Sequence, residues 1–149
     1  NLDLICILQP EPLLIRADSR RIWRVLENLY VNVCKYAMPG TRVYVDAIKK
    51  DGKIQLSIKN ISENPLNFQA DELTERFIRG DVSRSTEGSG LGLSIAKNLT
   101  VLQHGSFNIY LDGDLFKVTI TFDEAVKEKK PMPPMIVPEA VQEEAQQDA

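Results

Sequence analysis

The sequence has 149 residues and a formal net charge of −3; 43% of the residues are hydrophobic and 26% are charged. This composition is typical of a soluble globular domain. It includes no apolar run of about 18 residues that would span a membrane, and no basic stripe of the kind that favours nucleic-acid binding. Cys6 and Cys34 have neither metal-ligand spacing nor the arrangement of a disulfide framework.

The N-terminal quarter of the chain is predicted to contain extended segments followed by a long helix. Residues 2–8 (LDLICIL) and 12–18 (PLLIRAD) have the composition of short strands or extended segments. Asp18 or Ser19 is a suitable N-cap for a helix over about 20–37. Apolar residues recur there at helical spacing, namely Ile22, Val25, Leu26, Leu29, Val33 and Ala37.

Two β-hairpins are indicated by apolar residues that alternate with polar ones on both sides of a short turn. The first turns at Asp51-Gly52 and the second at Asp112-Gly113-Asp114. In the first hairpin the inward-facing residues are predicted to be Val43, Val45, Ala47, Ile54, Leu56 and Ile58. In the second they are predicted to be Phe107, Ile109, Leu111, Phe116, Val118, Ile120 and Phe122.

The remaining segments complete the predicted organisation. A short helix is expected over 70–77, and a second long helix over about 91–103 that Gly105 ends. This order fits an α+β fold, a two-layer sandwich in which a mixed sheet of about five strands packs against three helices. Residues 1–123 form the predicted domain. Residues 124–149 are rich in Pro, Glu and Gln, and we expect them to be a disordered tail.

A polar loop containing Gly88-Ser89-Gly90-Leu91-Gly92-Leu93 leads into the second long helix. It lacks the Gly-Lys-Ser/Thr of a P-loop and the spacing of a dinucleotide-binding fingerprint. Glycines before a helix N-terminus expose backbone N–H groups to an anion, and arginines upstream suit phosphate oxygens. The pattern therefore favours anion binding, although such a loop can also be a flexible linker.

Three polar residues of the first helix form a stripe beside its apolar face. Asn28, Asn32 and Lys35 lie at i, i+4 and i+7. Asparagine is a poor helix former, so two on one stripe suggest a role. An amide oxygen can bind a hard cation and Lys35 can bind phosphate, but a solvated polar face gives the same pattern.

Together these segments resemble the catalytic, ATP-binding domain of bacterial sensor histidine kinases, a GHKL-type domain. Residues 24–37 (RVLENLYVNVCKYA) resemble the N box, residues 73–81 (LTERFIRGD) the F box, and residues 87–99 (EGSGLGLSIAKNL) the G2 box. The resemblance covers about residues 13–122. It implies the Bergerat-type ATP-binding sandwich that gyrase, heat-shock chaperone and mismatch-repair ATPases share, with ATP between the N-box helix and a lid.

The resemblance also assigns roles to individual residues. It implies that Asn32 holds the Mg²⁺ that bridges the phosphates, that Asn28 and Lys35 are neighbouring polar and phosphate-binding residues, and that Tyr36 lies near the adenine. Glu27 is a weaker acid/base candidate, because it points about 100° away from Asn28 on a helix. The implied lid and G2 residues are Arg79 or Arg84 for the γ-phosphate, and Gly88, Gly90, Leu91, Gly92 and Leu93 around the phosphates.

One motif departs from the family pattern. The G1 box, D-x-G-x-G, carries the Asp that accepts a hydrogen bond from the adenine amino group, and here Asn60 stands at that Asp and Ser62 at the first glycine. An amide oxygen still accepts, without the charge-assisted component. We therefore expect adenine binding to be weaker by about 1–2 kcal/mol.

The implied function is binding of Mg-ATP and transfer of the γ-phosphoryl group to a histidine on a separate dimerisation domain, for signalling to a response regulator. His104, the only histidine, is expected at a helix C-terminus and not as the phosphoacceptor. We expect a cytoplasmic domain of a membrane-anchored, homodimeric kinase, without direct contact to membrane or nucleic acid. Two alternatives remain: a degenerate GHKL module that acts in docking or regulation, and another ATPase or anti-sigma kinase of the same superfold.

Overall fold

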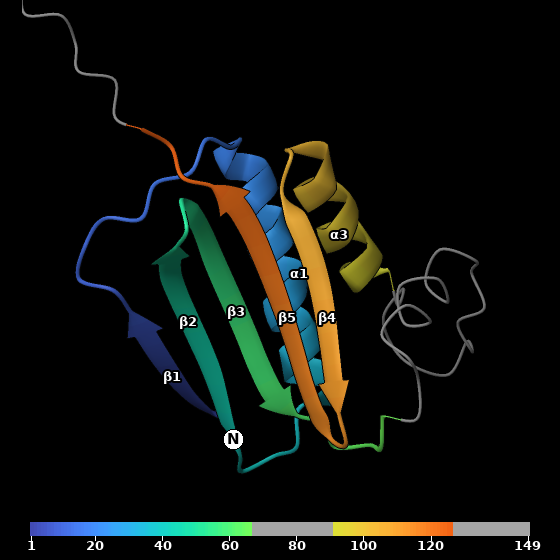
Figure 1. Ribbon diagram of the computed structural model, residues 1–149. Coiled ribbons are helices and arrows are strands. Elements are labelled where there is room, and N and C mark those ends of the chain that lie inside the picture. Colours follow the sequence, from blue (N-terminus) through green and yellow to red (C-terminus); the bar gives the residue numbers. More distant parts are fainter. Residues whose placement is uncertain (67–90, 127–149) are drawn as a thin grey trace, which may run out of the picture.

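A mixed sheet and a layer of helices make up the part of the chain that the computed structural model describes, residues 1–66 and 91–126 (Figure 1). Its five strands lie in the order β1-β2-β3-β5-β4. β1 pairs with β2 in parallel, and the other pairs are antiparallel. The strands are β1 (Asp3–Leu8), β2 (Arg42–Lys50), β3 (Lys53–Ile61), β4 (Ser106–Asp112) and β5 (Leu115–Asp123).

Both predicted hairpins are confirmed. Asp51 and Gly52 have φ angles of 52° and 73°, as a type I′ turn between β2 and β3 requires. Gly113, in the β4–β5 turn, has a φ of 57°. The predicted inward-facing residues are buried or half-buried on one face of the sheet, which the alternation of side chains along a strand explains.

The first helix, α1, spans Ser19–Tyr36, within one residue of its predicted bounds. Asp18 is the N-cap, because its side chain accepts hydrogen bonds from the backbone N–H groups of Arg20 and Arg21. The segment before it is not a strand. It forms a single bridge, between Ile15 and Glu124, since prolines at its start remove backbone donors that a ladder needs.

The second helix, α3, spans Gly92–Leu102 and ends in a Schellman motif. The N–H of Gly105 donates to Thr100 O, and the N–H of His104 donates to Val101 O, each at 3.0 Å. The left-handed residue is His104, with a φ of 66°, and not the glycine predicted to end the helix. Gly105 is required for another reason: a Cβ there would lie 2.6 Å from Cε1 of Phe122.

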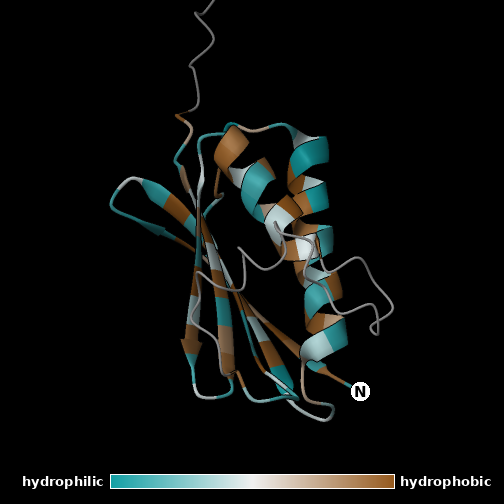
Figure 2. Cartoon of the chain, turned by 90° about the vertical axis from the view of Figure 1, so that its right-hand side faces the viewer, coloured by the Kyte–Doolittle hydropathy of each residue, from teal (hydrophilic) through white to brown (hydrophobic). Residues whose placement is uncertain are grey.

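The core lies between the inner face of the sheet and the two helices, which cover it from one side (Figures 1 and 2). Each fully buried aliphatic or aromatic side chain contributes about 1.5–3 kcal/mol. The buried core residues are Val25, Leu29, Val33, Ala37, Val43, Val45, Ile58, Leu93, Ala96, Phe116, Val118, Ile120 and Phe122.

The predicted α+β sandwich with a mixed five-stranded sheet is therefore confirmed. The described residues contain two of the three predicted helices, and the third, over 70–77, lies outside them. Most of the predicted tail also lies outside the described residues. The boundary at residue 123 stays a prediction, although backbone pairing continues to Ala125, whose N–H donates to Leu14 O at 2.8 Å.

Candidate functional site

The asparagine stripe lies along one flank of α1. Val25, Leu29 and Val33 bury the adjacent face of the helix in the core, which leaves Asn28 and Asn32 half-buried at its margin. Lys35, in the last turn, is exposed. A cation there also stabilises the helix through the macrodipole, so position alone does not make it a phosphate ligand.

The start of α3 approaches this stripe. A Cβ at Gly92 would lie 3.4 Å from Asn28 Oδ1 and 3.8 Å from the Asn28 carbonyl oxygen. The Asn28 amide is held in place, because its Nδ2 donates to Arg24 O at 2.8 Å. The structure therefore brings together the N-box helix and the last glycine of the glycine-rich loop, which lie more than sixty residues apart in the sequence.

The N-terminus of α3 is open to an acceptor. Leu91, at the N-cap position, has a side chain that cannot accept a hydrogen bond, and the first helical bond runs from Ile95 N to Leu91 O. The preceding N–H groups of the first turn have no acceptor within the helix. These groups, together with the positive end of the helix dipole, suit an anion.

Asn60 lies at the end of β3 and faces the helix layer. Its side chain is 3% exposed, and Nδ2 donates to Ile61 O at 3.2 Å. The other amide atom, Oδ1, is buried and has no hydrogen-bond partner among the described residues. A buried acceptor without a partner costs about 1–3 kcal/mol, so this oxygen indicates a missing donor.

The C-terminal end of α1 is joined to the same end of β3. Ala37 pairs with Ser62 in an isolated bridge. Met38 N donates to Ile61 O, and Glu63 N donates to Tyr36 O, both at 2.8 Å. Tyr36 and the end of β3 therefore form one corner of the sandwich.

The other predicted site residues divide into three groups. Leu93 is 3% exposed in the core, so only its backbone can contact a ligand, whereas Leu91 is 38% exposed. Glu27 is exposed on α1, outside the asparagine stripe. The residues outside the described part of the chain are Arg79, Arg84, Gly88 and Gly90.

The described residues include no group of three or more His, Cys, Asp or Glu side chains that could hold a metal ion. A cation at this site would depend on the Asn32 amide oxygen and on ligands from the nucleotide. That donor set suits Mg²⁺, which is commonly bound through few protein ligands, waters and substrate phosphates.

One contact, at the other end of α3, could not be predicted from any pattern in the sequence. Gln103, at the end of α3, accepts a hydrogen bond from Asp18 N at 2.8 Å and donates from Nε2 to Leu99 O at 3.0 Å. A cavity of about 470 Å³ lies beside Gln103, lined also by Arg16 and His104. None of the predicted site residues lines it, so it is separate from the asparagine stripe.

Comparison with known proteins identifies the family to which the chain belongs. Residues 17–126 match the family described as Histidine kinase-, DNA gyrase B-, and HSP90-like ATPase. The match covers well over half of the 149 residues, and the chain therefore belongs to this ATPase family.

Its relatives within the family are sensor histidine kinases. The chain is 34% identical over 108 residues to the sensor histidine kinase HprS of Escherichia coli (strain K12). This alignment covers 71% of this chain and 24% of the relative. It is 34% identical over 105 residues to the probable sensor histidine kinase TcrY of Mycobacterium tuberculosis, an alignment that covers 68% of this chain and 22% of TcrY. The chain thus spans about a quarter of the length of these curated relatives.

A solved structure shows the same fold. The mycobacterial sensor histidine kinase MprB superposes with a TM-score of 0.68 at 24% identity, over 83% of this chain and 82% of that one. Among the described residues, neither helix is long and apolar enough to cross a membrane.

Proposed function

We propose that this chain is the catalytic domain of a sensor histidine kinase, and that it binds Mg-ATP and delivers the γ-phosphoryl group to a histidine on a separate phosphoacceptor domain. The observation that carries the proposal is the buried, unpartnered Oδ1 of Asn60. The adenine amino group is a donor of the kind that this oxygen lacks. The orientation is fixed, because Nδ2 is already used by Ile61 O.

The remaining predicted residues receive roles consistent with their places. Asn32 would hold Mg²⁺, whose charge would offset that of the phosphates, with Asn28 beside it. The N-terminus of α3 at Gly92 would donate backbone N–H groups to phosphate oxygens. Arg79 and Arg84, from outside the described residues, are proposed to add charge at the γ-phosphate.

The chemical step is a phosphoryl transfer. A nitrogen of the acceptor histidine attacks the γ-phosphorus, the bond between this phosphorus and the β–γ bridging oxygen breaks, and ADP leaves. Catalysis in such a step comes mainly from positioning and charge neutralisation. Glu27 is proposed only as an acid/base candidate, because it lies outside the asparagine stripe; Glu27→Gln should reduce transfer and leave ATP binding intact if it has that role.

The test is isothermal titration of ATP into the chain with and without Mg²⁺. We expect heat of binding that depends on Mg²⁺ and is lost in Asn32→Ala. Val31→Ala, an exposed position of the same helix, is the matched control and should bind as the native chain does. Absence of binding at millimolar ATP would instead support the docking module, which the Asn60 and Ser62 substitutions in the G1 box favour.

A second assay identifies the acceptor. Radiolabelled ATP is incubated with this chain and the dimerisation domain of the parent kinase. Label that is lost in acid indicates phosphohistidine, whereas acid-stable label would indicate a serine kinase. We propose that the parent protein is a membrane-anchored homodimer with this domain in the cytoplasm, where ATP and the response regulator are found.

A further inference from the structure

A large apolar surface lies on the flank of α1 opposite the asparagine stripe. Trp23 is 71% exposed, and two residues of the neighbouring edge strand, Leu4 and Leu8, are 55% and 64% exposed. Leu4 and Leu8 pair in register with Val43 and Ala47, so they point to the helix side of the sheet and yet are uncovered. We call Leu4, Leu8 and Trp23 the β1–α1 flank.

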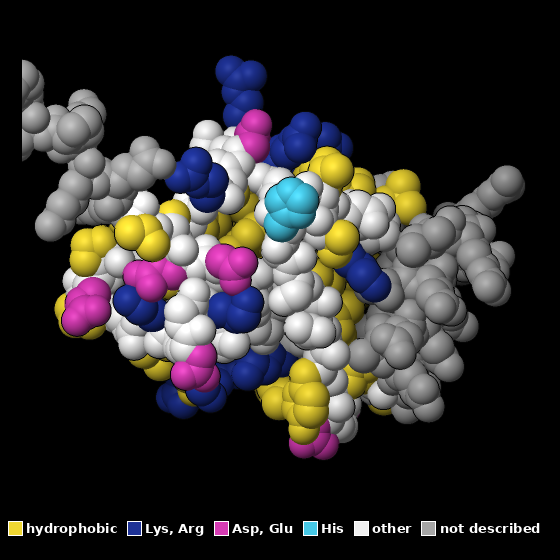
Figure 3. Space-filling view, turned by 45° about the horizontal axis from the view of Figure 1, so that its top comes forward, with side chains coloured by type: hydrophobic (Ala, Val, Ile, Leu, Met, Phe, Trp, Pro, Cys, Tyr) yellow, Lys and Arg dark blue, Asp and Glu magenta, His cyan; other side chains and the backbone are white. Residues whose placement is uncertain are grey.

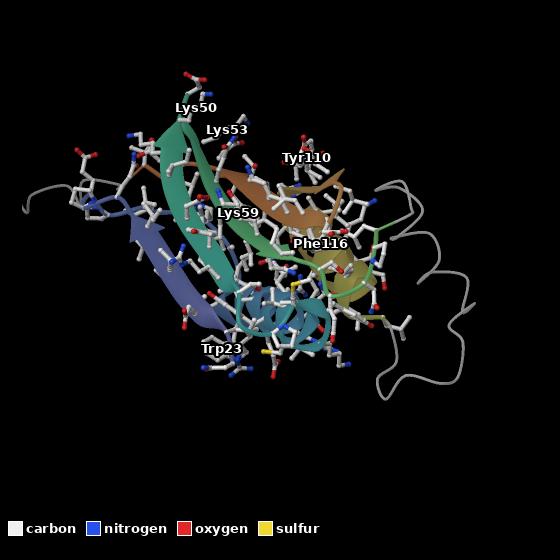
Figure 4. All side chains as sticks on the ribbon, turned by 90° about the horizontal axis from the view of Figure 1, so that it is seen from below. Trp23, Lys50, Lys53, Lys59, Tyr110 and Phe116 are labelled. Atoms are coloured by element: carbon white, nitrogen blue, oxygen red, sulfur yellow. The ribbon has the colours of Figure 1, made fainter. Side chains whose placement is uncertain are left out.

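Two observations place Trp23 on the side of α1 that faces β1. Tyr30 lies seven residues after Trp23, about 20° away around the helix, and the pKa of its hydroxyl is raised by burial and by the neighbouring Cys6 of β1. This side of α1 therefore faces β1. Figure 4 shows Trp23 projecting from the helix on the side where β1 lies. Exposed large apolar residues at a strand edge usually mark a binding surface or an aggregation hazard.

Positive charge borders the β1–α1 flank. Arg20 and Arg24, about 60° and 100° around the helix from Trp23, are exposed in the first two turns of α1, and the first turn contains no acidic residue. Neither arginine forms an ion pair within the described residues. Figure 3, in which the top of the molecule is tilted toward the viewer, shows Lys and Arg side chains along the upper edge. Cations at a helix N-terminus oppose the macrodipole, and a nearby anion would offset this cost.

The carboxylates near these arginines do not supply it. Asp18 uses Oδ1 to cap the backbone N–H groups of Arg20 and Arg21. Glu27 lies one turn farther along the helix, a single negative charge against two positive ones. Tryptophan and arginine are among the residues enriched in binding hot spots. The surface therefore fits a segment that is apolar at one end and acidic at the other.

The chain itself contains such a segment. Residues 135–137 (MIV) are apolar, and residues 139–149 (EAVQEEAQQDA) contain four acidic residues and no basic one. The described part of the chain ends at Val126, beside Leu14 and Ile15 and shortly before α1 begins. The 23 residues that follow can extend to about 75 Å, whereas α1 is about 27 Å long.

We propose that residues 135–149 bind in cis to the β1–α1 flank. The apolar residues cover Trp23 and Leu8, and the acidic residues lie against Arg20 and Arg24. Binding in cis needs only weak contacts, because a short tether gives an effective concentration in the millimolar range. The flank lies about 140° around the helix from Asn28, so a bound tail leaves the proposed nucleotide site open.

Trp23, the only tryptophan, is the probe. In the full chain we expect a blue-shifted emission and a several-fold lower acrylamide quenching constant than for a hydrated indole. The variant Glu139→Gln/Glu143→Gln/Glu144→Gln/Asp148→Asn should shift the emission to the red and restore quenching, as should high salt. Lys127→Gln/Lys129→Gln/Lys130→Gln, in the same tail, is the matched control and should keep Trp23 shielded.

The reciprocal variant, Arg20→Gln/Arg24→Gln, should have the same effect as the acidic variant. Combining the two should add little, as expected for partners in one interaction. A hydrated Trp23 in the full chain that no variant alters would overturn the proposal. Shielding that rises with protein concentration would also overturn it, in favour of a second copy of the chain. ATP titration of each variant is the independent check, because loss of nucleotide binding would concern the proposed function and not the flank.

Discussion

Replacing Asn60 by leucine separates a ligand-binding role from a structural one. In the absence of nucleotide, the unpartnered Oδ1 costs about 1–3 kcal/mol, and the Nδ2 bond to Ile61 O returns about 0.5–1.5 kcal/mol. Ile61 O keeps another donor, because Met38 N also binds it, at 2.8 Å. Asn60→Leu should therefore change the free energy of unfolding by about −0.5 to +2.5 kcal/mol, mostly toward greater stability.

The same variant should bind ATP less tightly. Loss of an acceptor that the adenine amino group would otherwise use costs about 1–3 kcal/mol, since the ligand donor is then left buried without a partner. This corresponds to a roughly 5- to 150-fold higher Kd. Asn60→Asp should act in the opposite direction, lowering stability because a charge is buried and strengthening adenine binding through a charge-assisted bond.

Urea denaturation measures the first quantity and isothermal titration with ATP the second. The combination of unchanged or higher stability with weaker binding is the signature of a residue kept for a ligand. If Asn60→Leu lowers stability by more than about 2 kcal/mol while the Kd for ATP stays the same, Asn60 is a structural residue and the reasoning fails.

Three further predictions concern the scaffold. Gly105→Ala should lower stability by about 1–3 kcal/mol, measured by thermal unfolding, because its Cβ would collide with the Phe122 ring; an unchanged Tm would show that the ring moves aside. Asp18→Ala should cost about 1 kcal/mol by removing the cap of α1, with Asp18→Asn as the control that retains it. The pKa of Asp123 is lowered by its hydrogen bond and ion pair with Lys53, 2.6 Å away. This pair therefore stabilises the fold above the carboxyl's unfolded pKa of about 4, and the contribution is lost as the pH falls through the lowered value. Lys53→Met should raise the Asp123 pKa in an NMR titration, and an unaltered titration would contradict the assignment.

Local signals in the sequence were sufficient for most of the elements. The Asp51-Gly52 dipeptide and its flanking alternation predict a hairpin because both the turn and the strands depend on near neighbours. Asp18 predicts the start of α1 for the same reason. At residues 12–18, predicted as a strand or an extended segment, local signals did not decide between the two, because strand formation depends on a distant partner. At the end of α3 the left-handed residue is His104, one residue before the glycine that was predicted to end the helix.

The candidate site could be predicted only in part. Asn28 and Asn32 are visible as a stripe, but their meeting with Gly92 depends on contacts between distant segments. The unpartnered oxygen of Asn60 follows from its burial, which no sequence pattern reports. Trp23 occupies a helical position from which periodicity alone cannot tell burial from exposure, so the β1–α1 flank became apparent only when α1 and β1 were seen together.

The place of β3 in the strand order has a consequence for selectivity. β3 is the middle strand and is hydrogen-bonded along both edges, to β2 and to β5. A group on its end is therefore fixed by the whole sheet, and little conformational entropy remains to be lost when a ligand binds it. The proposed contact with the base is thus assigned to the central strand of the sheet, and the proposed phosphate contacts to helix ends. The group that contacts the base would already have its binding conformation in the free protein. Different nucleotides should therefore differ in their dissociation rates more than in their association rates.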